Sequence, residues 1–294
     1  MTTRLPRVAA AIGGSLLALT LLASCAPADD EGGSPAPAAS GANACAKETL
    51  PVLTSGKLTI GTDKPAYEPW FKDDDPANGQ GFESAVAYAV AEKLGFAKTE
   101  VEWAVVPFNS VIQPGPKKFD FDINQVSITD ERKNAVDFSS GYYDVNQAVI
   151  ANNDSKIANA KSIADLKGAK LGAAVGTTSY KVITDTIKPS AQPAVFDNND
   201  IAKASLQNGQ IDGLLVDLPT AFYMTSAELE DAKIVGQFVN TQGTSQEKFG
   251  LVLEKGSKLT TCVSQAVDAL NADGTLKQIQ QQWLSSEAGA PVLS

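Results

Sequence analysis

Short apolar runs typical of β-strands alternate with segments of helical periodicity along most of this chain. Residues 57–63, KLTIGTD, predict a strand. The next segment, GFESAVAYAVAEKLGF, predicts a helix with Phe82, Val86, Ala89, Val90 and Leu94 on one face. Two further strands are expected at 101–107 and 119–128, the second leading into a helix that starts at Thr129.

The same alternation repeats beyond residue 147. Strands are expected at 147–152, 169–175, near 194–196, at 212–218 and at 249–256, and helices at 162–168, from Thr177, at 199–209, 259–272 and 275–285. This order predicts an α/β protein with mostly parallel sheets. In such proteins, ligand sites lie at the carboxyl ends of the strands.

Polar residues follow four of the predicted strands. Asp63 ends the first strand, Thr129 and Arg132 follow another, residues 176–179 follow a third, and Asp217 ends a fourth. We therefore expect these side chains to meet around one binding site.

The N-terminal residues have the pattern of an export signal. Arg4 and Arg7 precede an apolar run too short to span a membrane, and the run ends in Leu-Ala-Ser-Cys. That ending resembles the lipobox of bacterial lipoproteins, which predicts a signal peptide at 1–24 and a lipid on Cys25; a plain secretory signal is the alternative. Residues 25–45 are rich in Pro, Gly, Ala and Ser, and predict a flexible, lipidated linker.

Charge and cysteine content narrow the class of partner and the compartment. The net charge is -10, and loss of Arg4 and Arg7 with the signal makes it -12, which argues against nucleic acid or an anionic membrane surface as a partner. In an oxidising compartment Cys45 and Cys262 can form a disulfide. Cys262 also lies on an apolar helical stripe, so a buried free thiol is the alternative.

Several kinds of chemistry are missing from the sequence. The chain has no histidine, and it carries no G-x-S-x-G, Walker A or G-x-G-x-x-G pattern. Residues 73–75, Asp-Asp-Asp, lack the alternating ligands and the final Glu of a calcium loop. We expect no metal, no cofactor and no catalytic residue.

Five ordered segments resemble the extracytoplasmic solute-binding proteins of polar amino-acid ABC importers. They are GTDKPAYEPWF, INQVSITDERKNAVDFSSGYY, IADLKGAKLGAAVGTTSY, LQNGQIDGLLVDLP and DGTLKQIQQQWL, and the match runs from Leu58 to Trp283. The resemblance implies a two-lobed, periplasmic-binding-protein-like (type II) fold with a hinge of two crossover strands. Lobe 1 would comprise 46–148 and 247–294, lobe 2 would comprise 149–246, and the hinges would lie near 146–150 and 245–249.

Arg132 occupies the position that binds the ligand α-carboxylate in this family. A cation in the first turn of a helix is electrostatically unfavourable, so a role toward a ligand explains its place. A guanidinium binds a carboxylate through two parallel hydrogen bonds, and Thr129 caps the helix with its hydroxyl beside it. The alternative is a surface ion pair with Asp130 or Glu131.

The second lobe contributes the other end of the expected site. Gly176 allows close approach of the backbone, and Thr177 and Thr178 lie at a helix start that suits the same carboxylate. Asp217 corresponds to the residue that pairs with the ligand α-ammonium. The alternatives are an ordinary capped helix at Thr177 and a helix-capping role for Asp217.

The resemblance assigns the remaining positions around the ligand. Ser127 corresponds to a further ammonium contact, Tyr67 and Phe108 to aromatic residues that flank the ligand side chain, and either ring could instead pack in the core. Gln125 would narrow the pocket or add an amide donor, and Asp63 could accept a hydrogen bond from a polar ligand. Residues 114–116, Pro-Gly-Pro, depart from the family pattern and must end the helix after Phe108 early.

The expected protein is a lipid-anchored receptor for a polar α-amino acid on the outer face of the cytoplasmic membrane. It would act as a monomer and deliver the ligand to an ABC permease. The alternatives are an enzyme on the same fold, such as a dehydratase, and an amino-acid sensor subunit. The absence of histidine and of an apolar segment after the last helix favours the transport protein over both.

Overall fold

A computed structural model describes residues 45–239, 246–284 and 289–293. The predicted signal peptide, Cys25 and all but the last residue of the predicted linker lie outside the described residues. Within the described ranges, no helix combines the length and the apolar character needed to cross a bilayer.

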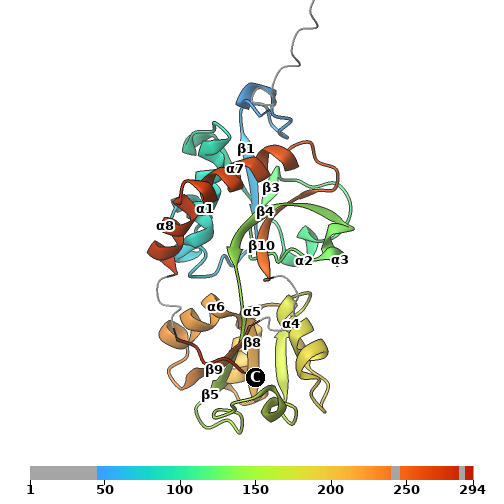
Figure 1. Cartoon of the computed structure of the whole chain (residues 1–294), viewed down its shortest axis with the longest axis vertical. Coiled ribbons are helices and arrows are strands. Elements are labelled where there is room, and N and C mark those ends of the chain that lie inside the picture. The colour runs from blue at the N-terminus through green and yellow to red at the C-terminus, as the bar shows by residue number, and fades with distance from the viewer. Residues whose placement is uncertain (1–44, 240–245, 285–288, 294) are drawn as a thin grey trace, which may run out of the picture. The chain divides into compact units, whose positions relative to one another are not determined.

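The first of two five-stranded sheets has the strand order β2-β1-β3-β10-β4 (Figure 1). Its strands are β1 (Leu58–Thr62), β2 (Val101–Val105), β3 (Phe121–Asp122), β4 (Val136–Asp144) and β10 (Lys248–Glu254). The second sheet has the order β7-β6-β8-β5-β9. Its strands are β5 (Gln147–Asn152), β6 (Leu171–Ala174), β7 (Ala194–Phe196), β8 (Gly213–Asp217) and β9 (Ala232–Phe238).

Each sheet contains one strand that runs against the other four. In the first sheet β10 is antiparallel to β3 and β4, and in the second sheet β5 is antiparallel to β8 and β9. The expectation of mostly parallel sheets therefore holds for the other four strands of each sheet. The reversed strands are the ones that enter each sheet from the other, so their amino ends lie beside the carboxyl ends of their neighbours.

Three long helices cover one face of the first sheet. They are α1 (Phe82–Lys93), α7 (Thr260–Ala272) and α8 (Thr275–Trp283), which pack against one another, with α7 lying against β4 (Figure 1). The short helices α2 (Phe108–Val111) and α3 (Asp130–Lys133) belong to the same lobe. α2 ends just before the Pro-Gly-Pro segment, as the sequence predicts.

The second sheet carries α4 (Thr178–Lys181), α5 (Asn199–Gln207) and α6 (Leu218–Tyr223). Helices α4 and α6 continue as π-helical turns over Val182–Ile187 and Met224–Glu228. Short 3₁₀ turns occur at Lys47–Thr49, Lys72–Asp74, Pro76–Asn78, Lys98–Glu100 and Ile163–Leu166. The last of these replaces the helix expected at 162–168, and the strand expected over 119–128 is reduced to β3.

Two apolar clusters in each lobe bury the two faces of its sheet. In the first lobe, Trp70, Phe82 and Phe249 lie in the larger cluster, and Val126 and Val252 lie in the smaller one. In β5, Val149 and Ala151 contribute to one cluster of the second lobe, and Ala148 and Ile150 to the other. Alternation along a strand that is buried on both sides produces the continuous apolar run seen in the sequence.

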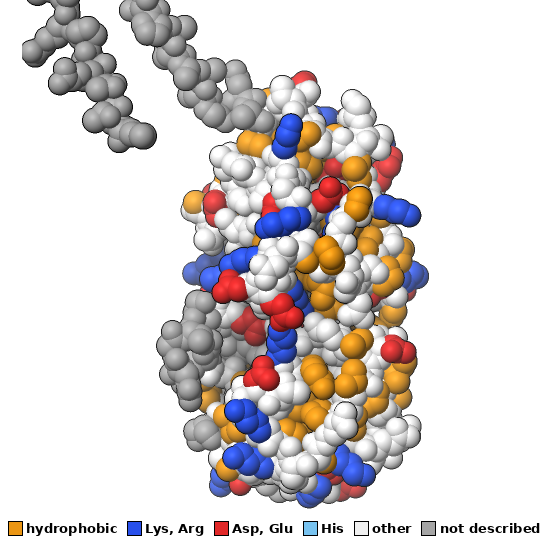
Figure 2. All heavy atoms as spheres, turned by 90° about the vertical axis from the view of Figure 1, so that its right-hand side faces the viewer, with side chains coloured by type: hydrophobic (Ala, Val, Ile, Leu, Met, Phe, Trp, Pro, Cys, Tyr) orange, Lys and Arg blue, Asp and Glu red, His pale blue; other side chains and the backbone are white. Residues whose placement is uncertain are grey.

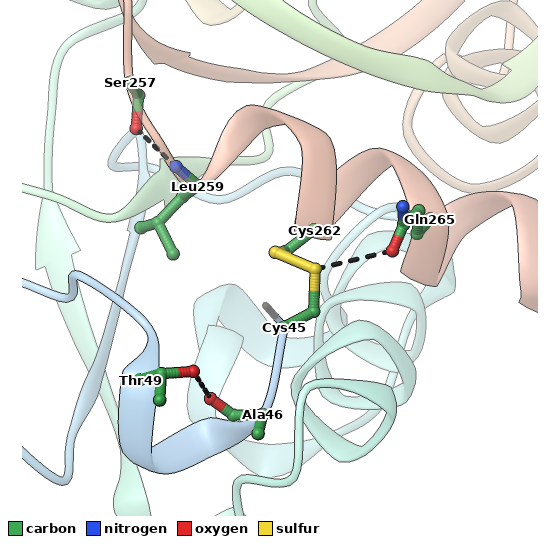
Figure 3. The surroundings of a disulfide bond; sticks show 7 residues. All are labelled: Cys45, Ala46, Thr49, Ser257, Leu259, Cys262 and Gln265. Atoms are coloured by element: carbon green, nitrogen blue, oxygen red, sulfur yellow. Dashed lines mark hydrogen bonds between the residues drawn. A yellow bond between two sulfur atoms is a disulfide. The ribbon is translucent and has the colours of Figure 1, made fainter. Parts of the chain in front are cut away.

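A disulfide between Cys45 and Cys262 joins the first described residue to α7 (Figure 3). The Cα atoms are 5.4 Å apart, and the bridge closes a sequence separation of 217 residues. Gln265 Oε1 lies 3.4 Å from the Cys45 sulfur. Because a bridged sulfur carries no proton, this approach is a van der Waals contact rather than a hydrogen bond.

The last described residues lie against the second sheet, whereas we expected the whole of 247–294 in lobe 1. Val292 pairs with Gln237 of β9 in a parallel bridge, and the Leu293 N–H donates to the Gln237 carbonyl at 3.0 Å. Leu293 is only 4% exposed and packs in a cluster of the second lobe. The physical reason is that β9 is the edge strand, whose free backbone groups accept another chain segment.

Charged side chains of both signs are mixed on the face shown in Figure 2. Several of the described lysines are paired with acids at exposed positions, including Lys181 with Glu131, Lys248 with Asp144 and Lys64 with Asp74. Such exposed pairs contribute little to stability. Lys181–Glu131 differs from the other two because it joins α4 of the second lobe to α3 of the first.

Candidate functional site

One cavity is lined by residues from both lobes. All of the predicted ligand-binding residues except Thr129 line it: Asp63, Tyr67, Phe108, Gln125, Ser127, Arg132, Thr177, Thr178 and Asp217. The rest of the lining is Pro107, Asn109, Asn124, Ala174, Val175, Ser179, Asp197, Asn198 and Asn199. These residues lie at or just after the carboxyl ends of β1, β2, β3, β6, β7 and β8, or on the helices that follow these strands.

Arg132 is held in place by two backbone carbonyls. Its Nη1 donates to the Ser127 carbonyl at 2.8 Å, and its Nη2 donates across the lobes to the Gly176 carbonyl at 2.9 Å. The side chain is 8% exposed, and its guanidinium carbon lies 5.5 Å from the centre of the Phe108 ring. Burial lowers the pKa of Arg132, while the carboxylates of Glu247 and Asp217 act in the opposite direction.

The helix around Arg132 differs from the one expected. α3 is a single turn, so Arg132 is as close to its carboxyl end as to its amino end, and the dipole argument from the sequence does not apply. The Thr129 hydroxyl accepts from the Arg132 backbone N–H at 3.2 Å. Thr129 therefore caps the turn, as expected, but does not reach the cavity itself.

Asp217 ends β8 and points its carboxylate away from the helix that follows. Its side chain makes no capping hydrogen bond to α6, whose first turn contains Pro219. Instead, the Gln147 amide donates to Asp217 Oδ1 at 2.6 Å, and the Ser179 hydroxyl donates to Gln147 Oε1 at 2.5 Å. Burial and the nearby Glu247 carboxylate raise the pKa of Asp217 to about 8.

Ser127 joins this cluster from the first lobe. Its hydroxyl donates to Glu247 Oε1 at 2.5 Å and lies 3.4 Å from the Thr178 hydroxyl. The Gln147 amide nitrogen lies 3.4 Å from the same Glu247 oxygen. Two carboxylates, of Asp217 and Glu247, therefore share one amide donor.

Gln125 turns most of its hydrogen-bonding capacity away from the cavity. Its φ angle is 48°, in the left-handed region, and both its backbone N–H and its side-chain amide donate to the buried Glu83 carboxylate. The Tyr142 hydroxyl donates to the same carboxylate. Burial raises the pKa of Glu83 to about 7, although these hydrogen bonds act against the rise. The amide nitrogen expected from Gln125 is thus already engaged.

Asp63, Phe108 and Tyr67 form another wall. Asp63 Oδ2 accepts from the Phe108 backbone N–H at 2.9 Å, which fixes the aromatic ring at the start of α2. The Tyr67 hydroxyl donates to Asp200 Oδ2 of the second lobe at 3.4 Å. Both rings line the cavity, and both also pack with part of their surface against the apolar clusters of the first lobe.

Two more groups bring the lobes together. The Trp70 indole N–H donates to the buried Thr220 hydroxyl at 3.0 Å. Gly176 has a φ of 75°, in the left-handed region that favours glycine, and its Cβ position lies 2.5 Å from Asn109 Oδ1, so the second lobe approaches α2 closely here. Together with the Arg132–Gly176 bond, these contacts describe a closed arrangement of the lobes around the cavity.

Some buried polar atoms of the first lobe have no hydrogen-bond partner in the described structure. They are Thr62 Oγ1, both carboxylate oxygens of Asp122 and the Asn124 amide nitrogen. Burial raises the pKa of Asp122 well above its ordinary value, and the carboxylates of Glu83 and Asp63 add to the rise. The described ranges contain no group of three or more Cys, Asp or Glu that could hold a metal ion.

Sequence reasoning did not identify Gln147, Glu247 and Glu83 as part of the site. Gln147 begins β5 and Glu247 immediately precedes β10, so both stand at the amino ends of the two reversed strands. A rule that looks only at carboxyl ends of strands cannot find them. The sequence feature that could have identified Gln147 and Glu247 is their position, as polar residues, within the two expected hinges.

The sequence profile of the family described as "Bacterial extracellular solute-binding proteins, family 3" matches residues 58–286. An L-arginine-binding protein of Pseudomonas aeruginosa is 29% identical over 262 residues, covering 83% of this chain and 95% of the relative. An ABC transporter arginine-binding protein 1 of Escherichia coli is 30% identical over 219 residues, with 69% and 81% covered.

The fold of this chain is also similar to that of a solved amino-acid-binding protein. An ancestral arginine-binding protein bound to glutamine is 32% identical, with a TM-score of 0.64 and coverage of 78% of this chain and 98% of that one. The profile match spans most of the chain, and the matching proteins are named for binding rather than for catalysis. The chain belongs to the bacterial extracellular solute-binding proteins of family 3, and it is a two-lobed solute-binding protein rather than an enzyme.

Proposed function

We propose that this protein is a lipid-anchored receptor that captures a polar α-amino acid by lobe closure and delivers it to an ABC importer. The observation that carries the proposal is the placement of Arg132 and Asp217 on one cavity but in different lobes. Arg132 would bind the ligand carboxylate, and Asp217 would bind its ammonium group. The Thr177 hydroxyl caps α4 and donates to the Ala174 carbonyl, so the donors for the carboxylate would be the backbone N–H groups of Thr177 and Thr178 and the Thr178 hydroxyl. Ser127 would supply an acceptor for the ammonium.

A zwitterion that bridges Arg132 and Asp217 binds the closed form better than the open form. Arg132 donates to the Gly176 carbonyl, a neutral acceptor on the second lobe. A carboxylate accepts a stronger, charge-assisted pair of hydrogen bonds from the same guanidinium. This difference between the states supplies the free energy that shifts the lobes toward closure.

The charge of the lining residues favours a ligand with a polar side chain, and a cationic side chain more than a neutral one. Asp63, Asp197 and Asp217 line the cavity, whereas Arg132 is the single cation among the lining residues. The amides of Asn109 and the other lining Asn and Gln residues add neutral donors and acceptors. Because acids outnumber the cation among the lining residues, a ligand with positive charge or amide donors is preferred over an aliphatic one.

Anchoring and delivery are proposed from the N-terminal pattern and from the relatives. Acylated Cys25 would tether the domain to the membrane, and the linker up to residue 45 would let it reach a permease. The matched Escherichia coli relative is named as an ABC transporter protein, which supports an importer as the partner. Mass spectrometry of the mature N-terminal peptide should find a diacylglyceryl group on Cys25. An unmodified N-terminal peptide starting elsewhere would overturn the anchor.

A thermal-shift screen of the refolded, ligand-stripped domain tests the proposed ligand class. The series contains the natural amino acids, cystine, and decarboxylated and deaminated counterparts of each stabilising compound. We expect one or a few polar α-amino acids to raise the melting temperature and their counterparts to have little effect. No response to any α-amino acid would overturn the proposal.

Two variants connect a positive result to the site. Arg132→Gln should abolish the shift, because it removes the charge that faces the ligand carboxylate. Lys133→Gln removes the same charge from the next position of α3, where the side chain pairs with exposed Asp130. That matched control should retain the wild-type shift.

A further inference from the structure

Glu247 stands behind the cavity, at the start of the strand that returns to the first lobe. It is half-buried and does not line the cavity, but Ser127, which does, lies directly against it. The contact is built into the backbone: Ile128 N–H donates to the Lys248 carbonyl at 2.8 Å, and Gly250 N–H donates to the Val126 carbonyl at 3.0 Å. The segment that carries Ser127 is therefore locked in register with β10.

The hydrogen bond between Ser127 and Glu247 has a fixed direction. A carboxylate can only accept, and a serine hydroxyl has one proton, so the Ser127 proton points toward Glu247. The Ser127 Oγ and Glu247 Oε1 atoms are 2.5 Å apart. The lone pairs of the Ser127 oxygen are left for its other neighbours. Ser127 thus presents an acceptor, not a donor, to anything that enters the cavity.

Gln147 fixes the direction of the hydrogen bonds on the second-lobe side in the same way. Its amide nitrogen donates to Asp217 at 2.6 Å, and its carbonyl takes the Ser179 proton at 2.5 Å. Within the described ranges, no Lys or Arg nitrogen forms an ion pair with Asp217 or Glu247. The carboxyl groups of Asp217 and Glu247 and the oriented Ser127 hydroxyl therefore form an acidic, acceptor-rich end of the cavity, in which Asp217 ionises when it pairs with a cationic group.

We propose that Glu247 is a positioning residue for recognition of the ligand α-nitrogen, because it fixes Ser127 as an acceptor and adds negative charge behind Asp217. The consequence is selectivity: an α-ammonium group, with three donors, is accepted, whereas an α-hydroxyl group, with one donor and no charge, is disfavoured. This inference rests on the proposed function. It adds a specificity determinant that does not touch the ligand.

The test compares an α-amino acid that the wild type binds with the α-hydroxy acid of the same side chain, by calorimetry. In Glu247→Gln, the new amide can donate to Ser127, which lets the hydroxyl proton turn toward the cavity. At pH 8.5, where most of Asp217 is ionised in the wild type as well as in the variant, we expect at least a tenfold loss of affinity for the amino acid, with the affinity for the hydroxy acid unchanged or improved. The preference of the wild type for the α-nitrogen should therefore fall in this variant.

Two further variants separate this effect from hinge damage and from charge alone. Asp144→Asn removes a carboxylate near the same crossing, where it pairs with exposed Lys248, and should keep the wild-type preference. Glu247→Asp keeps the charge but has a shorter side chain to reach Ser127. Its preference for the amino acid over the hydroxy acid should lie between those of the wild type and Glu247→Gln. A purely structural role would instead weaken both ligands by the same factor.

The pH profile gives a second readout if the hydroxy acid binds too weakly to measure. Asp217 is faced by Glu247 before β10, Glu83 of α1, Arg132 of α3 and Tyr142 of β4. When amino-acid affinity is plotted against pH, the midpoint of the curve should move to lower pH in Glu247→Gln. It should not move in Asp144→Asn. An unchanged midpoint and an unchanged ligand preference in Glu247→Gln would overturn the inference. If the wild type binds no α-amino acid, the proposed function itself fails.

Discussion

Amino-acid binding should strengthen as pH rises through the weakly acidic range, because Asp217 must lose a proton before it can pair with an ammonium group. An ordinary aspartate has a pKa of about 3.9 and is ionised throughout this range. Burial and the Glu247 carboxylate instead raise the pKa of Asp217 to about 8. In the ligand-free protein this carboxyl is therefore mostly protonated at neutral pH and below.

The expected size of the effect follows from the fraction of protein that is competent to bind. With a pKa of about 8, roughly 1% of Asp217 is ionised at pH 6 and roughly 10% at pH 7, and the apparent dissociation constant scales inversely with that fraction. The affinity should thus improve about tenfold from pH 6 to pH 7. Binding at pH 6 should release close to one proton for each ligand bound.

Calorimetry at pH 6 and pH 7, in two buffers with different ionisation enthalpies, measures both the affinity and the released proton. Glu83 also titrates near this range, since burial raises its pKa to about 7, so Asp217→Asn is the required comparison. That variant should bind weakly and with a flat profile. A wild-type affinity that does not change between the two pH values, or a slope that persists in Asp217→Asn, would refute the reasoning.

Three predictions concern stability. Replacing both Cys45 and Cys262 by serine should lower the unfolding free energy by roughly 5 kcal/mol, since the bridge closes a 217-residue separation, and should leave ligand affinity within about twofold in the same calorimetric assay. Gly236→Ala should cost about 1–3 kcal/mol in denaturant unfolding, because its Cβ would lie 2.6 Å from Leu293 Cγ; no change would mean that the C-terminal segment is not packed there. Asp122→Asn should gain stability relative to wild type as pH rises above about 4, because the unfolded-state carboxyl then ionises while the buried carboxyl, with its raised pKa, keeps its proton; a pH-independent difference would contradict this account.

Hydrophobic periodicity was sufficient to place most of the elements. The helix that became α1 shows its apolar positions at helical spacing, and β5 shows a continuous apolar run because both of its faces are buried. Periodicity failed where tertiary contacts decide the local structure. Residues 119–128 read as one long strand, yet the backbone leaves the sheet after Asp122 so that Gln125 can adopt a left-handed conformation over Glu83.

The candidate site was predictable where it follows the carboxyl ends of strands. Asp63, Arg132 and Asp217 lie on the cavity as the sequence indicated. Gln147 and Glu247 were not predictable by the same rule, because they stand at the amino ends of strands whose direction depends on the crossing between lobes. The docking of residues 290–293 on β9 depends on an edge strand left open by the fold, and no local pattern signals it.

The most direct test of the account is a crystal structure of the protein with its best-binding amino acid. We predict that a carboxylate oxygen of the ligand lies within hydrogen-bonding distance of the Arg132 guanidinium and that the ligand ammonium lies within the same distance of Asp217. Density for the ligand in the reverse orientation, or outside the cavity between the lobes, would contradict the central claim that these two residues, one from each lobe, hold the two charges of the ligand.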